Sequence, residues 1–469
     1  MLQPYFNFIF VYRPQRFRTV GDLIINPKTM TRKIMILMLI IQSTTVLAQN
    51  QLFDQLIAEK FKSDEPGGTV LVARKGNVIY KHAFGMASLE LDVKMKPDMV
   101  FQIGSMTKQF TAVCILQLME QGKLKLNDPL SRYLDGLAPE WATVTLEHLL
   151  THTSGIPELQ VDQATPIAEL GNLSKSKPML FPAGSKMLYN NTGYAMLGHV
   201  IERVAKIPYP DYLQKNIILP LGMDHTYYNV NNRIFPGYVP AYIKKRNFIN
   251  FKGGIPVSAA GALLSNTEDL LKWNLGLVSG KIIGKETLKK AWTSYHLSDG
   301  KAINYGYGWA IGGSIQGSAI VEHGGISGGY MAYGIYLPIE EIYIAVFVNQ
   351  RGVLHELLAT EFAAIALGKP DMIKPIPVTD TVLQSYSGLY RNPENSERRI
   401  TFNDHNLYYQ QADNLVLKMI PYAADKFFFE NTTILVQVNR DNDRQLKSIT
   451  FYDKKYMNTP RTTLVKVLN

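Results

Sequence analysis

The stretch VFQIGSMTKQFTA, residues 100–112, places a serine and a lysine three positions apart at the start of a predicted helix. Residues at positions i and i+3 of a helix lie on one face, so the Ser105 hydroxyl and the Lys108 amine should be within reach of each other. A serine attacks a carbonyl carbon only when a base removes its proton. Lysine can be that base near pH 7 when burial or a neighbouring cation lowers its pKa.

The residues around this pair predict that it is buried. An apolar helix is expected over residues 105–122. Free N–H groups at its start would also stabilise negative charge that develops beside Ser105. Two other S-x-x-K sequences, at residues 174–177 and 298–301, lack such a helix and are expected in surface loops.

Length and composition indicate a globular protein with at least two domains. The chain has 469 residues, of which 46% are hydrophobic and 19% charged. Its formal charge of +10 is partly due to a basic leader, because residues 1–48 contain six Lys or Arg and one acidic residue. The remaining excess is spread thinly over the rest of the chain, which is typical of a solvated surface rather than a phosphate-binding stripe. Nucleic acid is therefore not expected as a partner.

Residues 30–48 have the three parts of a secretory signal peptide. Two basic residues precede the apolar segment 34–41, and Val46-Leu47-Ala48 is a small-residue cleavage site. The apolar segment is short for a bilayer. We expect cleavage after Ala48 and export to a bacterial periplasm or the extracellular space, with membrane attachment only if the segment stays uncleaved. Residues 1–29 are an N-terminal extension that precedes a second candidate start, Met30.

Cysteine and metal-ligand patterns exclude several kinds of site. The single cysteine, Cys114, excludes a disulfide or a Cys-based zinc site within one chain. It lies in an apolar segment and is expected to be a small buried hydrophobe. No H-E-x-x-H sequence or close cluster of His, Asp and Glu occurs, so neither a metal nor a cofactor is implied.

Strand and helix signals predict an α+β domain over residues 50–368. Two β-rich runs, Thr69–Ala73 and Val78–Phe84, predict a hairpin, and strand signals return at 305–311 and at three runs between 319 and 348. The segment between them is mainly helical. Strands from both ends must therefore form one sheet around a helical insertion.

The C-terminal part of the chain predicts a separate all-β domain. A proline-rich linker, residues 369–382, precedes short alternating runs over 383–469. Regular short strands with polar turns are typical of a small barrel or sandwich. The aromatic residues of these runs are expected in its core.

Four sequence blocks together resemble the serine β-lactamase and penicillin-binding protein superfamily, over roughly residues 52–368. They are FQIGSMTKQFTA (101–112), LEHLLTHTSGIP (146–157), FPAGSKMLYNNTGYAMLGHVIE (181–202) and EHGGISGGY (322–330). The likeness is greatest to the branch of class C β-lactamases, D-alanyl-D-alanine carboxypeptidases and related esterases. It implies an antiparallel sheet flanked by helices with a mainly helical subdomain. The C-terminal region resembles the lipocalin-like barrels attached to this family.

The resemblance assigns roles to residues of these blocks. It implies Ser105 as the nucleophile that forms an acyl-enzyme, and Lys108 as its base or proton relay. Tyr189 would face Ser105 and exchange protons with the leaving group or the deacylating water. Asn191 would hold Lys108 and the substrate amide.

The last block departs from the family pattern. His323-Gly324-Gly325 stands where penicillin-binding enzymes often have Lys-Thr-Gly. The glycines still let substrate approach the strand, and the backbone N–H groups of Ile326 and Ser105 would form the oxyanion hole. The cation that grips a substrate carboxylate is replaced by a histidine, which is largely neutral at pH 7. This favours an esterase or peptidase over a true β-lactamase.

The predicted function is an exported serine hydrolase acting on small ester, amide or peptide substrates, with D-amino acid and cell-wall derivatives among the candidates. A true β-lactamase or D-Ala-D-Ala carboxypeptidase is one alternative, and a catalytically silent binding protein on the same fold is another. Residues 325–329 also match G-x-S-x-G, the nucleophile elbow of α/β-hydrolases. That elbow requires a helix after it, whereas a strand is predicted to follow, so Ser327 is expected in a loop.

Overall fold

The computed structural model describes residues 48–467 apart from short gaps. The gaps are 160, 230–232, 245–246, 252–257, 353–354, 371–372, 412–415, 431 and 458–459. The predicted extension 1–29, and all of the predicted signal peptide except its last residue, lie outside the described residues. Leu52–Asn469 form one compact unit.

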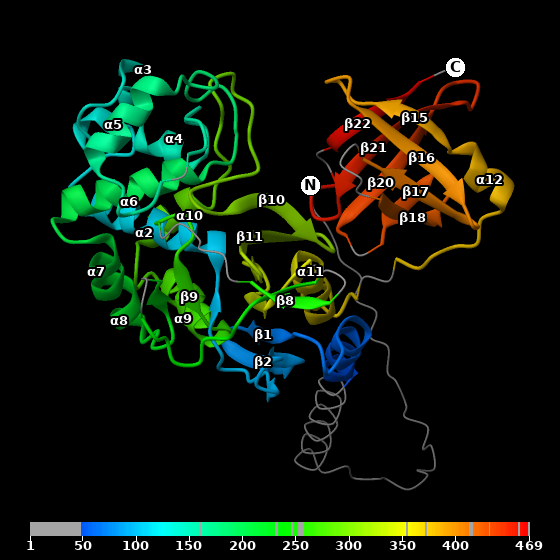
Figure 1. The fold of residues 1–469 in the computed structure, drawn as a ribbon, viewed down its shortest axis with the longest axis horizontal. Coiled ribbons are helices and arrows are strands. Elements are labelled where there is room, and N and C mark those ends of the chain that lie inside the picture. Colours follow the sequence, from blue (N-terminus) through cyan, green and yellow to red (C-terminus); the bar gives the residue numbers. More distant parts are fainter. Residues whose placement is uncertain are drawn as a thin grey trace, which may run out of the picture. The chain divides into compact units, whose positions relative to one another are not determined.

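A six-stranded antiparallel sheet lies at the centre of the first part of this unit, in the order β10-β11-β12-β13-β1-β2 (Figure 1). Its strands are β1 (Gly68–Arg74), β2 (Asn77–Phe84), β10 (Ala310–Ile315), β11 (Ser318–Ser327), β12 (Tyr330–Leu337) and β13 (Ile342–Val348). β1 pairs with β13 along its whole length. Strands from both ends of the domain therefore pair in one open sheet, as the sequence predicted.

Alternate residues of β1 enter two hydrophobic cores on opposite faces of the sheet. Leu71 and Ala73 belong to the core that contains α2 (Thr107–Glu120) and α9 (Thr267–Val278). Val70 and Val72 belong to the core that contains α11 (His355–Ala366). This alternation follows from the two-residue period of a strand. The helix α2, which follows the candidate nucleophile, is buried from Thr107 to Leu118.

Most of the remaining helices lie between β1–β2 and β10 in the sequence. They are α3 (Pro139–Ala142), α4 (Leu146–Leu150), α5 (Ile167–Ser176), α6 (Asn191–Ala205), α7 (Tyr209–Leu213), α8 (Leu219–Leu221) and α10 (Lys285–Ala291). The short strands are β3 (Met86–Ser88) with β4 (Val93–Lys94); β5 (Phe101–Gln102), β9 (Leu263–Ser265) and β6 (Tyr227–Tyr228); and β14 (Gln350–Arg351), β7 (Tyr242–Lys244) and β8 (Phe248–Asn250). This is the β-lactamase-like architecture that the sequence predicted.

The C-terminal part is a closed eight-stranded barrel. It is preceded by the short helix α12 (Asp380–Ser385). Its strands are β15 (Gly388–Arg391), β16 (Glu397–Asn403), β17 (Asn406–Gln410), β18 (Val416–Ala423), β19 (Lys426–Phe429), β20 (Ile434–Arg440), β21 (Leu446–Asp453) and β22 (Pro460–Lys466). Of the aromatics expected in its core, Tyr409, Phe427 and Phe429 are buried there. Tyr408 and Phe428 are half-buried and lie outside this core, because neighbouring residues of a strand point to opposite faces.

A buried ionic cluster joins the loop after β21 to the central sheet. The ammonium group of Lys455 lies 2.7 Å from Glu322 Oε1 on β11 and 2.6 Å from Glu356 Oε1 on α11. It also donates to the Tyr333 hydroxyl on β12 at 2.7 Å. Desolvation of the cluster is offset because the lysine has two carboxylates as partners.

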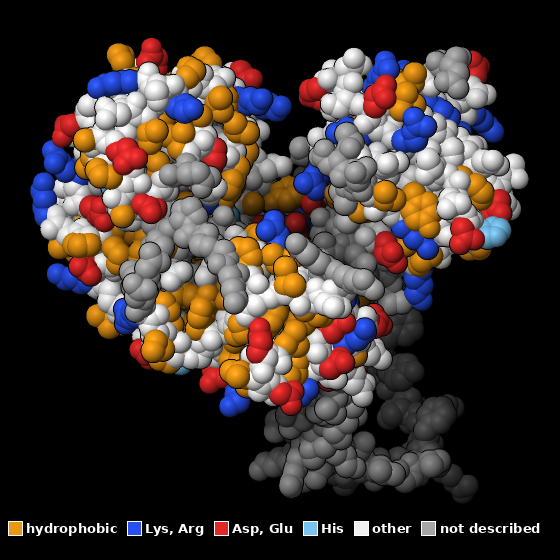
Figure 2. Space-filling view, viewed as in Figure 1, with side chains coloured by type: hydrophobic (Ala, Val, Ile, Leu, Met, Phe, Trp, Pro, Cys, Tyr) orange, Lys and Arg blue, Asp and Glu red, His pale blue; other side chains and the backbone are white. Residues whose placement is uncertain are grey.

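Two predicted elements differ from the structure. Residues Gly104–Met106 form a 3₁₀ turn, η1, before α2 begins, because Gly104 has a left-handed φ of +50°. The predicted strand 305–311 begins only at Ala310, because Gly308 has a φ of +87°, outside the extended region. Among the described residues, no helix has both the length and the apolar character needed to cross a membrane. Basic and acidic side chains are interspersed on the face drawn in Figure 2.

Candidate active site

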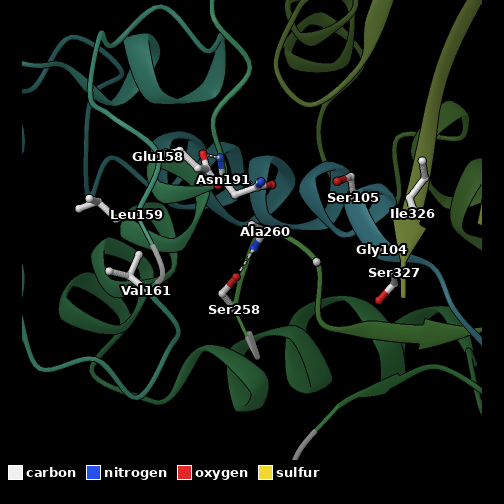
Figure 3. A pocket seen from close by; sticks show the side chains of 11 residues that line it. Gly104, Ser105, Glu158, Leu159, Val161, Asn191, Ser258, Ala260, Ile326 and Ser327 are labelled. Atoms are coloured by element: carbon white, nitrogen blue, oxygen red, sulfur yellow. Dashed lines mark hydrogen bonds between the residues drawn. The ribbon is translucent and has the colours of Figure 1, made fainter. Parts of the chain in front are cut away.

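Ser105 lies in the turn η1 and lines a cavity of about 240 Å³ (Figure 3). Its neighbours Gly104 and Met106 are buried, while Ser105 itself is half-buried. The hydroxyl therefore stands at the boundary between a packed core and a space that a substrate can enter, as a nucleophile requires.

Lys108 lies one turn further on, and its side chain is fully buried. Its ammonium nitrogen Nζ is 3.1 Å from Ser105 Oγ, 2.7 Å from Asn191 Oδ1 and 2.9 Å from the backbone oxygen of Ala260. All three partners are neutral, so they offset only part of the free-energy cost of burying the charged ammonium group. Burial lowers the pKa of Lys108 to about 7, against a smaller opposing effect of the Glu158 carboxylate.

Tyr189 is the second titratable side chain near Ser105. Lys108 Nζ lies 4.8 Å from the centre of its ring. The Ser105 hydroxyl is near enough to the Tyr189 phenol to oppose part of the rise in its pKa. The ring also packs against the imidazole of His152, with ring centres 4.2 Å apart. Although 41% of Tyr189 is exposed, desolvation of its phenol by the surrounding side chains raises its pKa well above its ordinary value. Tyr189 is therefore a neutral phenol at pH 7, and Lys108 is the better candidate for the base.

Two glycines let the backbones of η1 and β11 meet at the cavity wall. A Cβ atom on Gly325 would lie 1.8 Å from the backbone oxygen of Ile103 and 3.0 Å from the Ser105 nitrogen. A Cβ atom on Gly104 would lie 2.8 Å from the Ile326 nitrogen. Only glycine fits at these two positions. The backbones of Ser105 and Ile326 thus lie beside each other on the cavity wall, the arrangement that an oxyanion hole needs.

His323 is held in one neutral form. Its Nδ1 lies 2.6 Å from the backbone oxygen of Gly324, which can only accept, so Nδ1 carries the proton. Its Nε2 then accepts from the Tyr305 hydroxyl at 2.9 Å. Burial and, next, the charge of Lys108 lower the pKa of His323 to about 3. The ring is buried and is not among the residues that line the cavity, while Gly324 packs against the ring of Tyr333.

Residues 50–367 match the family model described as "Beta-lactamase". The chain belongs to the β-lactamase family. It is 28% identical to "Penicillin-binding protein 4*" of Bacillus subtilis (strain 168) over 435 residues, which cover 84% of this chain and 95% of that protein. The octameric penicillin-binding protein homologue from Pyrococcus abyssi superimposes with a TM-score of 0.62 at 27% identity, covering 90% of this chain and all of that one.

A more distant structure shares the fold of the first domain. D-amino acid amidase from Ochrobactrum anthropi SV3, complexed with D-phenylalanine, superimposes with a TM-score of 0.59 at 18% identity. The match covers 68% of this chain and 99% of the amidase. The family assignment therefore rests on the family model, which matches the region containing Ser105, Lys108 and Tyr189.

Of the residues predicted from the family blocks, Ser105, Asn191 and Ile326 line the cavity. Lys108 is hydrogen bonded to Ser105, and the Tyr189 ring packs beside the Lys108 amine. The match S-x-x-K at 174–177 was expected in a surface loop, which is wrong. Ser174 is buried in α5, where its hydroxyl donates to the backbone oxygen of Gly171.

Ser327 also differs from its prediction as a loop residue. It is the last residue of β11, lines the cavity and donates a hydrogen bond to Gln102 Oε1. The following element is the strand β12, so residues 325–329 do not form a nucleophile elbow.

Sequence reasoning missed one charged residue of the cavity, Glu158. It follows the block LEHLLTHTSGIP directly, but no spacing relative to Ser105 marks it in the sequence. Its carboxylate accepts hydrogen bonds from the side chains of Asn190 and Asn191, which bring it to the cavity wall. Sequence reasoning also missed the Ala260 carbonyl that holds Lys108, since a backbone acceptor leaves no signal in the residue type.

Proposed function

We propose that this protein is an exported serine hydrolase that cleaves ester or amide bonds through an acyl-enzyme on Ser105. One observation carries the proposal: the fully buried amine of Lys108 lies 3.1 Å from the Ser105 hydroxyl. Its partners there are neutral, and burial brings its pKa to about 7. A serine with a half-neutral amine at hydrogen-bond distance is an activated nucleophile at physiological pH.

In the acylation step, the neutral amine of Lys108 takes the proton from Ser105 Oγ as the oxygen attacks the carbonyl carbon. The N–H groups of Ser105 and Ile326 stabilise the oxyanion that forms. The tetrahedral intermediate then collapses with cleavage of the bond to the leaving group. Tyr189, a phenol whose ring centre lies 4.8 Å from Lys108 Nζ, passes a proton to the departing alcohol or amine.

Deacylation reverses these roles with water as the nucleophile. A water molecule gives a proton to the Lys108–Tyr189 pair and attacks the acyl carbon. The bond to Ser105 Oγ breaks, and the oxygen recovers its proton. The products are a carboxylic acid and the alcohol or amine released in the first step, and no redox change or cofactor is needed.

The main alternative is a true β-lactamase or D-Ala-D-Ala carboxypeptidase, which differs from the proposed enzyme in its substrate. The similarity to penicillin-binding protein 4* over most of both chains supports that alternative. Penicillins and D-Ala-D-Ala peptides carry a carboxylate, and the neutral, buried His323 offers it no cation. We therefore favour ester, amide or peptide substrates without that carboxylate, including D-amino acid amides, the substrate class in the name of the amidase.

Active-site labelling tests this function. The purified protein is incubated with a fluorophosphonate and separately with a fluorescent penicillin, and the adduct is located by mass spectrometry. We expect the fluorophosphonate on Ser105, no adduct in Ser105→Ala, and full labelling in the control Ser298→Ala, which changes the exposed serine of another S-x-x-K sequence outside the cavity. Labelling by both probes would support the penicillin-recognising alternative. Absence of any adduct in the unsubstituted protein would support the silent binding protein instead.

Export is proposed from the signal-like segment at residues 30–48 and from the bacterial source of penicillin-binding protein 4*. N-terminal sequencing of the protein recovered from the periplasm or medium of an expressing bacterium tests it. We expect a new N-terminus at Gln49, and retention of the intact segment in the cytoplasm would contradict export.

A further inference from the structure

The carboxylate of Glu158 shares the cavity with the nucleophile. Figure 3 shows Glu158 beside Asn191, to which it is hydrogen bonded, with Ser105 on the same cavity. Asn191 Oδ1 in turn accepts from Lys108, whose amine contacts Ser105. A single amide side chain therefore separates the carboxylate from the catalytic amine.

Three hydrogen bonds fix the orientation of this carboxylate. Oε2 accepts from Asn190 Nδ2 at 3.0 Å and from the backbone nitrogen of Asn191 at 2.8 Å. Oε1 accepts from Asn191 Nδ2 at 2.9 Å. A carboxylate has about four acceptor positions, so Oε1 keeps capacity for one more donor. The group is held in place before any ligand arrives.

A purely structural role at the start of α6 does not account for Glu158. The helix already has a side-chain cap, because Asn190 Oδ1 accepts from the Gly193 nitrogen at 2.7 Å. Glu158 also remains exposed toward the cavity although its three donors are satisfied. A ligand that enters the cavity therefore meets a charged oxygen with a free acceptor position.

The other polar groups around the cavity do not balance this charge. Among the lining residues that the structure describes, Glu158 is the only ionisable side chain apart from the nucleophile, and the rest are small, apolar or amide residues. Lys108 is buried behind Ser105 and directs its amine to three neutral acceptors. The cavity thus presents a negative group to an incoming acyl chain, which repels carboxylates and attracts ammonium groups.

We propose that Glu158 binds the ammonium group of the substrate's acyl part, so that the preferred substrates are small amino-acyl esters and amides with a free amine. The proposal rests on the proposed hydrolase function and names its substrate class. The asparagine amides orient the carboxylate, and an ammonium group a few bonds from the scissile carbonyl donates to Oε1 while Ser105 attacks. A cavity of about 240 Å³ accommodates an acyl group of this size.

Pairs of esters that differ only by an ammonium or a methyl group test the proposal. Alanine methyl ester, as both enantiomers, is compared with methyl isobutyrate, and β-alanine methyl ester with methyl butyrate, by acid release at pH 7. We expect the unsubstituted protein to have a higher kcat/KM for an amine-bearing member. In Glu158→Gln the ratio within that pair should fall by about tenfold or more, because a charge-assisted hydrogen bond is lost. Taking the ratio cancels any loss of Ser105 reactivity common to both esters.

A matched control removes a negative charge elsewhere. Glu169, exposed on α5, does not line the cavity, so Glu169→Gln should keep the ratio of the unsubstituted protein. The proposal is overturned if the neutral esters are hydrolysed as fast as the amine-bearing ones. It is also overturned if a fluorophosphonate labels Ser105 but no amine-bearing ester is hydrolysed, or if Glu158→Gln leaves the ratio unchanged. Failure of fluorophosphonate labelling would instead refute the underlying hydrolase function.

Discussion

Replacing Lys108 with arginine removes the only neutral amine beside Ser105 in the described structure while keeping a long basic side chain. Burial lowers the pKa of Lys108 from 10.5 to about 7. At pH 7 a lysine with the ordinary pKa is neutral in about one molecule in 3,000, whereas at a pKa of 7 half are neutral. Burial thus raises the neutral fraction of Lys108 about 1,500-fold. Because a guanidinium stays charged, we expect Lys108→Arg to lose at least about 1,000-fold in kcat/KM.

The assay is kcat/KM for p-nitrophenyl acetate between pH 5 and 9, with the uncatalysed rate subtracted. The unsubstituted protein should gain tenfold per pH unit below pH 7 and level off above it, because the amine acts only when deprotonated. Lys123→Arg, an exposed lysine just after α2, is the matched control and should behave like the unsubstituted protein. A flat profile from pH 5.5 to 8, or more than a tenth of the activity in Lys108→Arg, would refute the assignment of Lys108 as the base.

Three further predictions follow from the same contacts. In Gly325→Ala the new Cβ would clash with the Ile103 carbonyl and displace the backbone N–H groups of the oxyanion hole, so we expect kcat to fall about 100-fold or more. An unchanged kcat would contradict the assignment of the oxyanion hole. Glu158 raises the pKa of Lys108, so Glu158→Gln should move the break in the pH profile to lower pH by about 0.3 to 1 unit, and a shift to higher pH would show that the carboxylate acts otherwise. Lys455→Met leaves Glu322 buried without its cation and should lower the free energy of unfolding in urea by about 3–5 kcal/mol at pH 8. The unpaired carboxyl then has a folded-state pKa above its unfolded value, so the loss should shrink at pH 5, and equal losses at both pH values would contradict this account.

Local patterns in the sequence were sufficient for much of the fold. The β-rich runs Thr69–Ala73 and Val78–Phe84 lie in β1 and β2, and the short runs after residue 383 form a closed barrel. Predictions failed where backbone conformation overrode residue type. The predicted strand 305–311 is interrupted because Gly308 adopts a left-handed φ, a state that composition does not reveal.

The candidate site divides in the same way. The helical spacing of Ser105 and Lys108, and the pairing of their block with the one around Tyr189, were readable in the sequence. The role of His323 was only partly readable. Its neutrality was expected from residue type, but its enclosure by Tyr305 and the Gly324 carbonyl comes from tertiary contacts.

The sequence by itself identified Ser105 and Lys108 as the candidate pair, because helical turns bring residues three positions apart to one face. Only the tertiary structure decided whether they are reactive and what they meet. The pKa of Lys108 depends on its burial and on partners 83 and 152 positions away, Asn191 and Ala260. The charge of the cavity depends on Glu158, which two asparagines of a distant block hold in place. Such properties arise from the exclusion of water and from contacts between remote segments, and neither is encoded in local spacing.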